Sequence, residues 1–263
     1  MLSKRILTAL IGIPALIFIF YQGGLILLGV VILLILLGLY EYRNLVNRSG
    51  HHPMSLPLCL GGLLMPLAVQ YYGESAGTAA FIYAVVTLVY YLFRHHSFSP
   101  LDLALSFLGF LYIVLGFTNL LFLRSMEQGF WLLVYIFVIV WSTDTAAYFI
   151  GTYFGRHSLA PDISPKKSWE GFIAGIVFSL LTVYILTAVA HLERAWLLLV
   201  ITPIISVAGQ LGDLFESTLK RFAGIKDSGN IFPGHGGILD RFDSALWAAP
   251  FAYHLIICLE RLF

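Results

Sequence analysis

Side chains that could bind phosphate or a divalent cation gather in three segments of the second half of the chain. The first begins with WSTD, residues 141–144, and includes SPKKSWEG, residues 164–171; the second is GQLGDLFESTLKR, residues 209–221; the third is KDSGNIFPGHGGILDRFDS, residues 226–244. Each segment lies at the end of a long apolar stretch. Ionisable groups are costly beside lipid and usually have a function when they occur there. The three segments therefore make up the candidate site.

The basic pair Lys166 and Lys167 has two interpretations. The lysines could anchor the chain at the membrane surface, with Ser168 capping the next helix and Glu170 favouring its first turn. Alternatively, they attract a phosphate group at the interface. Asp144, near the end of the preceding apolar stretch, needs a polar partner in either case.

Helical spacing in the second segment predicts a polar stripe. If the helix continues past the apolar stretch, Asp213, Ser217 or Glu216, and Lys220 recur on one face. A structural alternative is an i,i+4 ion pair between Glu216 and Lys220 at the water boundary. That alternative leaves Asp213, deeper in the apolar run, unexplained, so a functional role is favoured for Asp213.

Glycines and carboxylates of the third segment predict binding of phosphate and metal. Gly234, Gly236 and Gly237 would let the backbone approach an anion, and a helix N-terminus just beyond them would favour phosphate. Asp240 and Asp243 share a helical face, which is unfavourable for two carboxylates unless a cation lies between them. Oxygen ligands, without Cys or His at zinc spacing, indicate Mg²⁺.

His235 stands alone among these glycines. In order of preference, it could donate a hydrogen bond to phosphate, stabilise the loop or act as a general acid.

The elements that position these segments are predicted to be membrane-spanning helices. The chain has 263 residues, of which 59% are hydrophobic and 11% charged, with a mean hydropathy of +0.89. A soluble domain usually carries about a quarter charged residues. We therefore expect an all-α polytopic integral membrane protein with about nine transmembrane helices. The approximate spans are 6–22, 24–41, 54–71, 76–93, 101–123, 129–150, 171–190, 195–216 and 245–262.

The stretches 54–71 and 101–123 are the least regular, and either could be re-entrant or interfacial. We expect a single membrane domain over 1–263, with scaffold helices in 1–128 and catalytic helices and cytoplasmic loops in 129–263. Met1 to Arg5 and the following apolar run are interpreted as an uncleaved first helix.

Basic residues predict the orientation of these helices. With the N-terminus in the cytoplasm, twelve Lys and Arg residues fall in cytoplasmic segments and three fall outside, which is a positive-inside bias. The candidate site would then face the cytoplasm. The near-neutral net charge of +1 makes nucleic acid an unlikely partner.

The polar positions around the third segment resemble, position for position, the signature of phosphatidate cytidylyltransferases. The run is Ser217-x-x-Lys220-Arg221-x4-Lys226-Asp227-x-Gly229-x3-Pro233-x-His235-Gly236-Gly237-x-x-Asp240-Arg241-x-Asp243. Residues 164–171 resemble a second family motif, with Ser168 where threonine is expected, and residues 212–217 resemble a third. The motifs cover residues 141–244, whereas the N-terminal half agrees only in being hydrophobic and multi-spanning.

The resemblance implies transfer of a cytidylyl group from CTP to phosphatidic acid, which releases pyrophosphate and gives CDP-diacylglycerol. It implies Mg²⁺, with room for a second cation of unknown identity, on Asp213 and Asp240, with Asp227 and Asp243 in support. The phosphates of CTP and of the lipid would be held by four cationic residues, Lys220, Arg221, Lys226 and Arg241. The pocket would be completed by Asp144 and Lys167. The expected catalytic residues are Asp213, Asp240, Lys220, Lys226 and Asp227. The expected metal ligands are Asp213, Asp240 and Asp243. The expected substrate-binding residues are Lys166, Lys167, Ser217, Arg221, His235, Gly236, Gly237, Arg241 and Asp144.

Two other functions remain as alternatives. A CTP-dependent kinase acting on a polyprenol-type lipid alcohol would need a base, for which Asp227 is the candidate. An ion-coupled transporter would place charges near the bilayer midplane, often in a two-fold repeat, whereas here they crowd at one face.

Chain length and glycine spacing bear on location and assembly. The small size favours a bacterial plasma (inner) membrane. Gly151-x-x-x-Gly155 and Gly171-x-x-x-Gly175 would allow close helix packing, either within the chain or in a homodimer.

Overall fold

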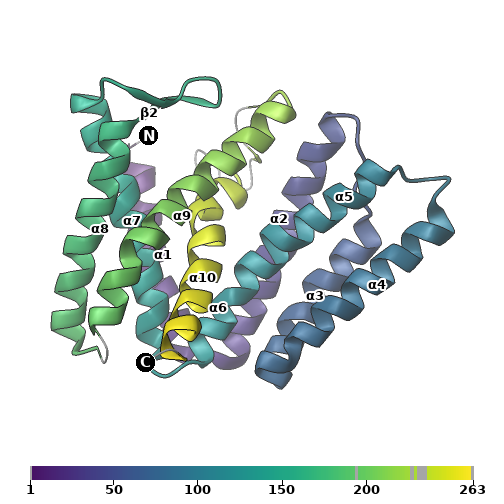
Figure 1. Ribbon diagram of the computed structural model, residues 1–263, viewed down its shortest axis with the longest axis horizontal. Coiled ribbons are helices and arrows are strands. Elements are labelled where there is room, and N and C mark those ends of the chain that lie inside the picture. Colours follow the sequence, from purple (N-terminus) through teal and green to yellow (C-terminus); the bar gives the residue numbers. More distant parts are fainter. Residues whose placement is uncertain (1, 193–194, 226–227, 230–235, 262–263) are drawn as a thin grey trace. The chain divides into compact units, whose positions relative to one another are not determined.

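The computed structural model describes residues 2–192, 195–225, 228–229 and 236–261, with the backbone alone for residues 2–11 and for Glu74. Helices account for most of the described chain, which agrees with the expected fold class (Figure 1). Their bounds are α1 (Leu2–Gln22), α2 (Gly24–Arg48), α3 (Ser55–Tyr72), η1 (Gly73–Ala76), α4 (Gly77–Arg94), α5 (Pro100–Gly109), η2 (Phe110–Leu115), α6 (Gly116–Ser125), α7 (Gly129–Phe154), α8 (Trp169–Ala190), α9 (Ala195–Phe222) and α10 (Leu239–Glu260).

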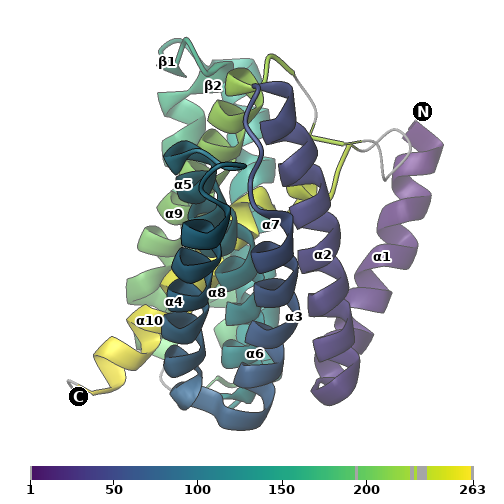
Figure 2. The same cartoon turned by 90° about the vertical axis from the view of Figure 1, so that its right-hand side faces the viewer.

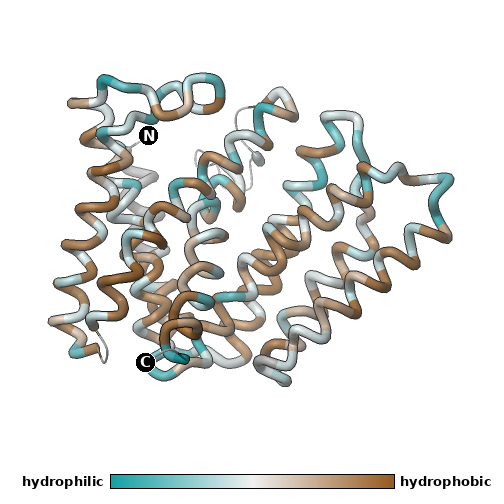
Figure 3. The backbone as a smooth tube through the Cα atoms, in the orientation of Figure 1, coloured by the Kyte–Doolittle hydropathy of each residue, from teal (hydrophilic) through white to brown (hydrophobic). Residues whose placement is uncertain are grey.

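Helices long and apolar enough to cross a membrane occur throughout the described chain. By length and composition, eight helices in the described residues are able to cross a membrane, and Gly12–Gln22 of α1 forms a shorter apolar helix. Figure 3 shows their predominantly hydrophobic colouring. Both irregular stretches are among the eight: α3 continues through Pro66, and α5 continues into α6 through the π-helical turns of η2. The expectation of a polytopic, all-α membrane protein is confirmed.

The described chain packs as two compact units. The first is Met1–Ser125 with Leu219–Arg241, and the second is Met126–Thr218 with Phe242–Phe263. The unit boundaries fall within α9 and α10, so each of these helices contributes residues to both units. The first unit thus combines the N-terminal helices with part of the motif region.

In the first unit, a polar contact network fixes the ends of the helices. The Tyr42 hydroxyl on α2 donates to the Leu105 carbonyl of α5 at 2.8 Å. Asp102 closes a capping box with Ser99 at the start of α5 and accepts the backbone N–H of His52 at 2.6 Å. Figure 2 shows α2 and α3 running side by side. Because buried backbone N–H groups need acceptors, these contacts specify how α2, α3 and α5 meet.

In the second unit, glycines allow α7 and α8 to run in close contact (Figure 1). A Cβ at Gly171 would lie 2.7 Å from the Ala147 carbonyl oxygen and 3.2 Å from the Gly151 Cα. A Cβ at Gly175 would lie 2.9 Å from the Thr143 side chain. Both glycine motifs are therefore used for packing within this chain.

A short hairpin, β1 (Ser158–Ala160) and β2 (Ser164–Ser168), joins α7 to α8. The strands pair antiparallel, with Ser158 opposite Ser168 and Ala160 opposite Ser164. The sequence did not predict this hairpin, because strands of three and five residues carry too little periodicity to be recognised.

We predict that Gly171→Ala destabilises the chain by about 1–3 kcal/mol, because the new methyl group would meet α7 backbone, which cannot move aside locally. Unfolding in mixed micelles measures the change. Gly29→Ala on α2 is the matched control, since a Cβ there has nothing within 4 Å. Equal stability of the two variants would contradict the packing role of Gly171.

Candidate functional site

The hairpin carries the basic motif of residues 164–171 and delivers it to the start of α8. The Trp169 N–H donates to the His157 carbonyl at 2.9 Å, and the Glu170 carboxylate accepts the Arg156 N–H at 3.1 Å and contacts the His157 ring at 2.6 Å. Ser168 accepts the Gly171 N–H as the N-cap of α8. The predicted cap and the predicted first-turn carboxylate are both confirmed.

Lys167, on β2, forms an ion pair with Asp213 of α9 at 2.7 Å. Both side chains are partly exposed, with 25% and 33% of their surface accessible. Lys166, its neighbour on the strand, is exposed. The two lysines thus have different surroundings: among the described residues, the hairpin directs Lys167 to a carboxylate and leaves Lys166 exposed.

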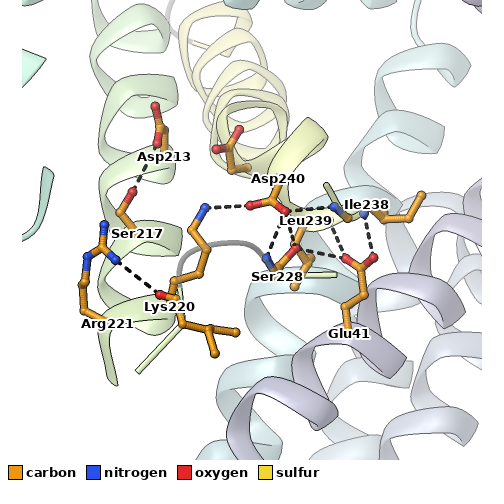
Figure 4. Close-up of polar contacts among 12 residues, drawn as sticks. Glu41, Asp213, Ser217, Lys220, Arg221, Ser228, Ile238, Leu239 and Asp240 are labelled. Atoms are coloured by element: carbon orange, nitrogen blue, oxygen red, sulfur yellow. Dashed lines mark hydrogen bonds and ion pairs between the residues drawn. The ribbon is translucent and has the colours of Figure 1, made fainter. Parts of the chain in front are cut away.

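Asp213 lies on α9, which remains helical to Phe222, as the predicted polar stripe required. The Ser217 hydroxyl, one turn further, approaches Asp213 Oδ1 at 3.5 Å (Figure 4). Gly212 allows α10 to approach closely: a Cβ there would lie 2.6 Å from the Asp243 carbonyl oxygen and 3.0 Å from the Trp247 ring. Because glycine has no side chain at position 212, the α9 segment at Asp213 can lie against the α10 segment at Asp243.

Four carboxylates of the second unit lie in one electrostatic neighbourhood. Asp243 interacts with Asp213, Glu216 and Asp144, and Asp144 interacts with Asp213 and Lys167. Glu216 is completely buried. Because like charges at this density repel each other, the cluster favours a bound cation in addition to Lys167.

The donor set of this cluster suits Mg²⁺. Carboxylate oxygens are the ligands that Mg²⁺ prefers, and it usually retains several waters and substrate phosphate oxygens as further ligands. Within the described residues, His, Cys, Asp and Glu side chains form no group of three or more arranged to hold a metal ion. A cation bound through one or two carboxylates remains compatible with this arrangement.

The first unit holds a second polar cluster, centred on Asp240 at the start of α10 (Figure 4). Asp240 Oδ1 accepts from the Lys220 ammonium at 2.7 Å. Asp240 Oδ2 accepts from the backbone N–H and the hydroxyl of Ser228 and from the Gly237 N–H, each at 2.9 Å. Gly236 adopts a φ of +80°, and a Cβ there would lie 2.6 Å from the Asp240 carboxylate. A side chain at position 236 would therefore displace Asp240.

Glu41 of α2 belongs to the same cluster, although sequence analysis assigned it no role. It is buried, with 2% of its surface accessible, and it accepts the backbone N–H groups of Ile238 and Leu239 at 2.9 Å each. A carboxylate close to the end of a long apolar run was the only signal in the sequence, and it resembled an ordinary interfacial residue.

The remaining predicted site residues are either exposed or lie outside the described part of the chain. Arg221 is exposed and donates to the Ile225 carbonyl at 3.3 Å, and Arg241 is exposed. Lys226, Asp227 and His235 lie outside the described residues. The structure thus brings together Asp144, Lys167, Asp213, Ser217 and Asp243 in one unit, and Lys220, Gly236, Gly237 and Asp240 in the other.

Comparison with known proteins gives a match over nearly the full length. The model of the cytidylyltransferase family matches residues 3–259. Phosphatidate cytidylyltransferases of Staphylococcus saprophyticus, Staphylococcus epidermidis and Staphylococcus aureus are each 38% identical to the chain, with 97% of this chain and 99% of each relative aligned. The similarity therefore includes the N-terminal helices, which carry none of the recognised motifs.

We predict that Lys220→Met lowers the free energy of unfolding by about 3 kcal/mol, because it removes a cation from a largely buried carboxylate. A double-mutant cycle with Asp240→Asn should show a coupling of about 0.5–3 kcal/mol. Unfolding in mixed micelles measures both quantities, and Lys166→Met on the exposed face of β2 is the control. Strictly additive effects would show that the pair contributes nothing to stability.

Proposed function

This chain belongs to the cytidylyltransferase family, and on that premise we propose that it transfers the cytidylyl group of CTP to phosphatidic acid, forming CDP-diacylglycerol and pyrophosphate. The observation that carries the proposal is the full-length similarity to bacterial phosphatidate cytidylyltransferases, together with the spaced polar motifs. The eight candidate spans suit an enzyme whose lipid substrate and product both reside in the bilayer.

The proposed reaction needs positioning and charge neutralisation more than a base. A phosphate oxygen of phosphatidic acid forms a new bond to the α-phosphorus of CTP, and the bond from that phosphorus to the oxygen bridging the α- and β-phosphates breaks. Pyrophosphate leaves with the electron pair. The attacking phosphate is already ionised at neutral pH, so in-line alignment and neutralisation of negative charge supply most of the catalysis.

We propose that Asp213 and Asp243 hold Mg²⁺, with Asp144 nearby in the same unit. The bound cation would neutralise charge on the triphosphate and on the leaving pyrophosphate. Lys167, now paired with Asp213 at 2.7 Å, is proposed to move onto a phosphate when substrate arrives. Lys166 is proposed to supply further positive charge from the same strand.

In the other unit, Asp240, whose Oδ1 accepts from Lys220, is proposed to keep the metal-binding role that the family resemblance implies. Lys220, Arg221 and Arg241 are proposed to hold the phosphates of CTP and of the lipid, since cationic side chains bind phosphate oxygens directly. The three predicted residues outside the described part of the chain are proposed to keep the roles that the family resemblance implies: Lys226, Asp227 and His235.

The proposed location is a bacterial plasma membrane with the motif-bearing loops in the cytoplasm. The distribution of basic residues favours this orientation. CTP is a polar anion that is made in the cytoplasm, so the nucleotide would reach these loops without crossing the bilayer.

We predict that the purified protein in detergent, with Mg²⁺, radiolabelled CTP and phosphatidic acid, yields a lipid-extractable cytidine product. Asp213→Asn and Asp240→Asn should each lower the rate by ~100-fold or more, because each removes a carboxylate proposed to bind the cation that neutralises charge on the phosphates. Asp162→Asn, in the exposed hairpin turn, is the matched carboxylate control and should remain active. Label transferred from γ-labelled CTP to a lipid alcohol, with no product from phosphatidic acid, would instead identify a lipid kinase.

Removal of divalent cations provides a separate prediction. Treatment with EDTA should abolish product formation, and added Mg²⁺ should restore it, because carboxylate oxygens bind this hard cation reversibly. Direct titration of Mg²⁺ binding to the parent and to Asp213→Asn gives a readout that is independent of turnover. Full activity in EDTA would rule out the proposed metal role.

A further inference from the structure

Glu41 occupies an unusual position for a carboxylate on a membrane-spanning helix. The spacing of Gly38, Glu41 and Leu45 places it on the buried face of α2, among the residues that pack against the rest of the first unit. Its two carboxylate oxygens accept the N–H groups of Ile238 and Leu239 at 2.9 Å, and Oε2 also accepts from the Ser228 hydroxyl at 3.3 Å (Figure 4). The side chain therefore spans from α2 to the first turn of α10.

Helix electrostatics explain why this buried carboxylate is tolerated. The first N–H groups of a helix have no acceptor within the helix and carry a partial positive charge. Ile238 and Leu239 stand at the start of α10, so their N–H groups favour an anion. Helix N-termini frequently bind phosphate, but at the start of α10 the carboxylate of Glu41 occupies the place that a phosphate would take.

The segment held by Glu41 also holds Asp240. The Ser228 hydroxyl lies within hydrogen-bond distance of both carboxylates, at 3.3 Å from Glu41 and 2.9 Å from Asp240. The Gly237 N–H donates to Asp240, and the next two N–H groups along the chain donate to Glu41. Movement of Glu41 would therefore be transmitted through Ser228 and the turn at 237–239 to Asp240.

Two glycines are needed at this contact because of Glu41. A Cβ at Gly229 would lie 2.5 Å from Glu41 Oε1 and 2.9 Å from its Cδ, and its three nearest atoms all belong to Glu41. A Cβ at Gly237 would collide with both Glu41 oxygens and with the Ser228 hydroxyl. These glycines make room for a protein carboxylate, whereas the sequence had suggested that Gly237 makes room for substrate phosphate.

We propose that Glu41 is a positioning residue for cytidylyl transfer: from the N-terminal helices it anchors the α10 terminus and residues 228–229, and thereby fixes the orientation of Asp240 and Lys220. This inference rests on the proposed roles of Asp240 and Lys220 in the reaction. It gives the N-terminal half of the chain a part in catalysis through a residue that does not touch substrate.

The proposal and the phosphate-binding alternative make opposite predictions for CTP. If the α10 terminus binds a nucleotide phosphate, Glu41 competes with that phosphate, so its neutralisation should lower the KM for CTP. If Glu41 positions Asp240 and Lys220, its neutralisation should lower kcat and leave the KM for CTP unchanged or raised.

The first experiment compares Glu41→Gln and Glu41→Asp with the parent in the full-length protein in detergent. Glu41→Gln preserves size but replaces one acceptor oxygen by an amide donor facing N–H groups, so kcat should fall by ~10–100-fold, as expected for small misplacements of catalytic groups. Glu41→Asp, which retains the charge, should recover part of that loss. Hydrogen exchange of the peptide containing Ile238 and Leu239 should accelerate in Glu41→Gln, whether or not turnover is measured.

Asp102→Asn is the matched control. Asp102 is also a buried carboxylate of the first unit that accepts backbone N–H groups at a helix start, through Ser99 and His52. Its neutralisation should affect stability comparably while leaving kcat and exchange at 238–239 near the parent values. An equal loss of kcat in Asp102→Asn would show that Glu41 acts only through general stability and would overturn the proposal.

A second experiment approaches the same contact from the loop. Gly229→Ala should lower kcat because its methyl group meets Glu41, and Glu41→Asp in the same chain should restore activity by withdrawing the carboxylate. Additive losses in the double variant would contradict the proposal. A kcat and an exchange rate in Glu41→Gln that match the parent would also contradict the proposal, and so would a lowered KM for CTP.

A parent protein that is inactive on CTP and phosphatidic acid would instead refute the proposed function. Hydrogen exchange at residues 238–239 would still test the Glu41 contact in that case.

Discussion

A carboxylate inside a membrane-spanning bundle must receive hydrogen bonds or a cation, because it cannot remain ionised against apolar side chains alone. The first unit meets this constraint in two ways. Glu41 uses the unsatisfied N–H groups at the start of α10, and Asp240 uses Lys220, Ser228 and Gly237. The same contacts determine where α10 begins relative to α2. Satisfaction of buried charge and placement of the proposed catalytic groups therefore depend on the same contacts in this unit.

Close approach between the backbones of neighbouring helices is a second requirement of this fold. Gly212 brings the Asp213 and Asp243 segments together, and Gly171 does the same for α7 and α8. Helices in lipid gain no hydrophobic driving force from contact, so small residues that permit close packing are the usual means of association. A reaction whose nucleophile is already ionised depends on such positioning of charge more than on proton transfer. The glycines of the motifs thus contribute by allowing contacts that larger residues would prevent.

Local sequence patterns predicted much of this arrangement. Hydropathy predicted the helices, and the polar stripe of Asp213, Ser217 and Lys220 was predicted on condition that α9 continues beyond the apolar stretch, which it does. The capping role of Ser168 was also predictable, since a cap depends on residues three apart. The β1–β2 hairpin was missed because its strands are short. The bonds from Gly237, Ile238 and Leu239 to carboxylates were missed as well, because spacing identifies a helix start but not the group that it binds.

The sequence by itself determined that the chain forms membrane helices and which polar residues are candidates for the chemistry, because hydropathy, helical period and motif spacing are properties of neighbouring residues. Only the tertiary structure decided that Lys167 pairs with Asp213, and that Glu41 caps a helix 197 and 198 residues further along the chain. No local period encodes such a contact. It arises when distant helices pack and a buried carboxylate meets the N–H groups that stabilise it.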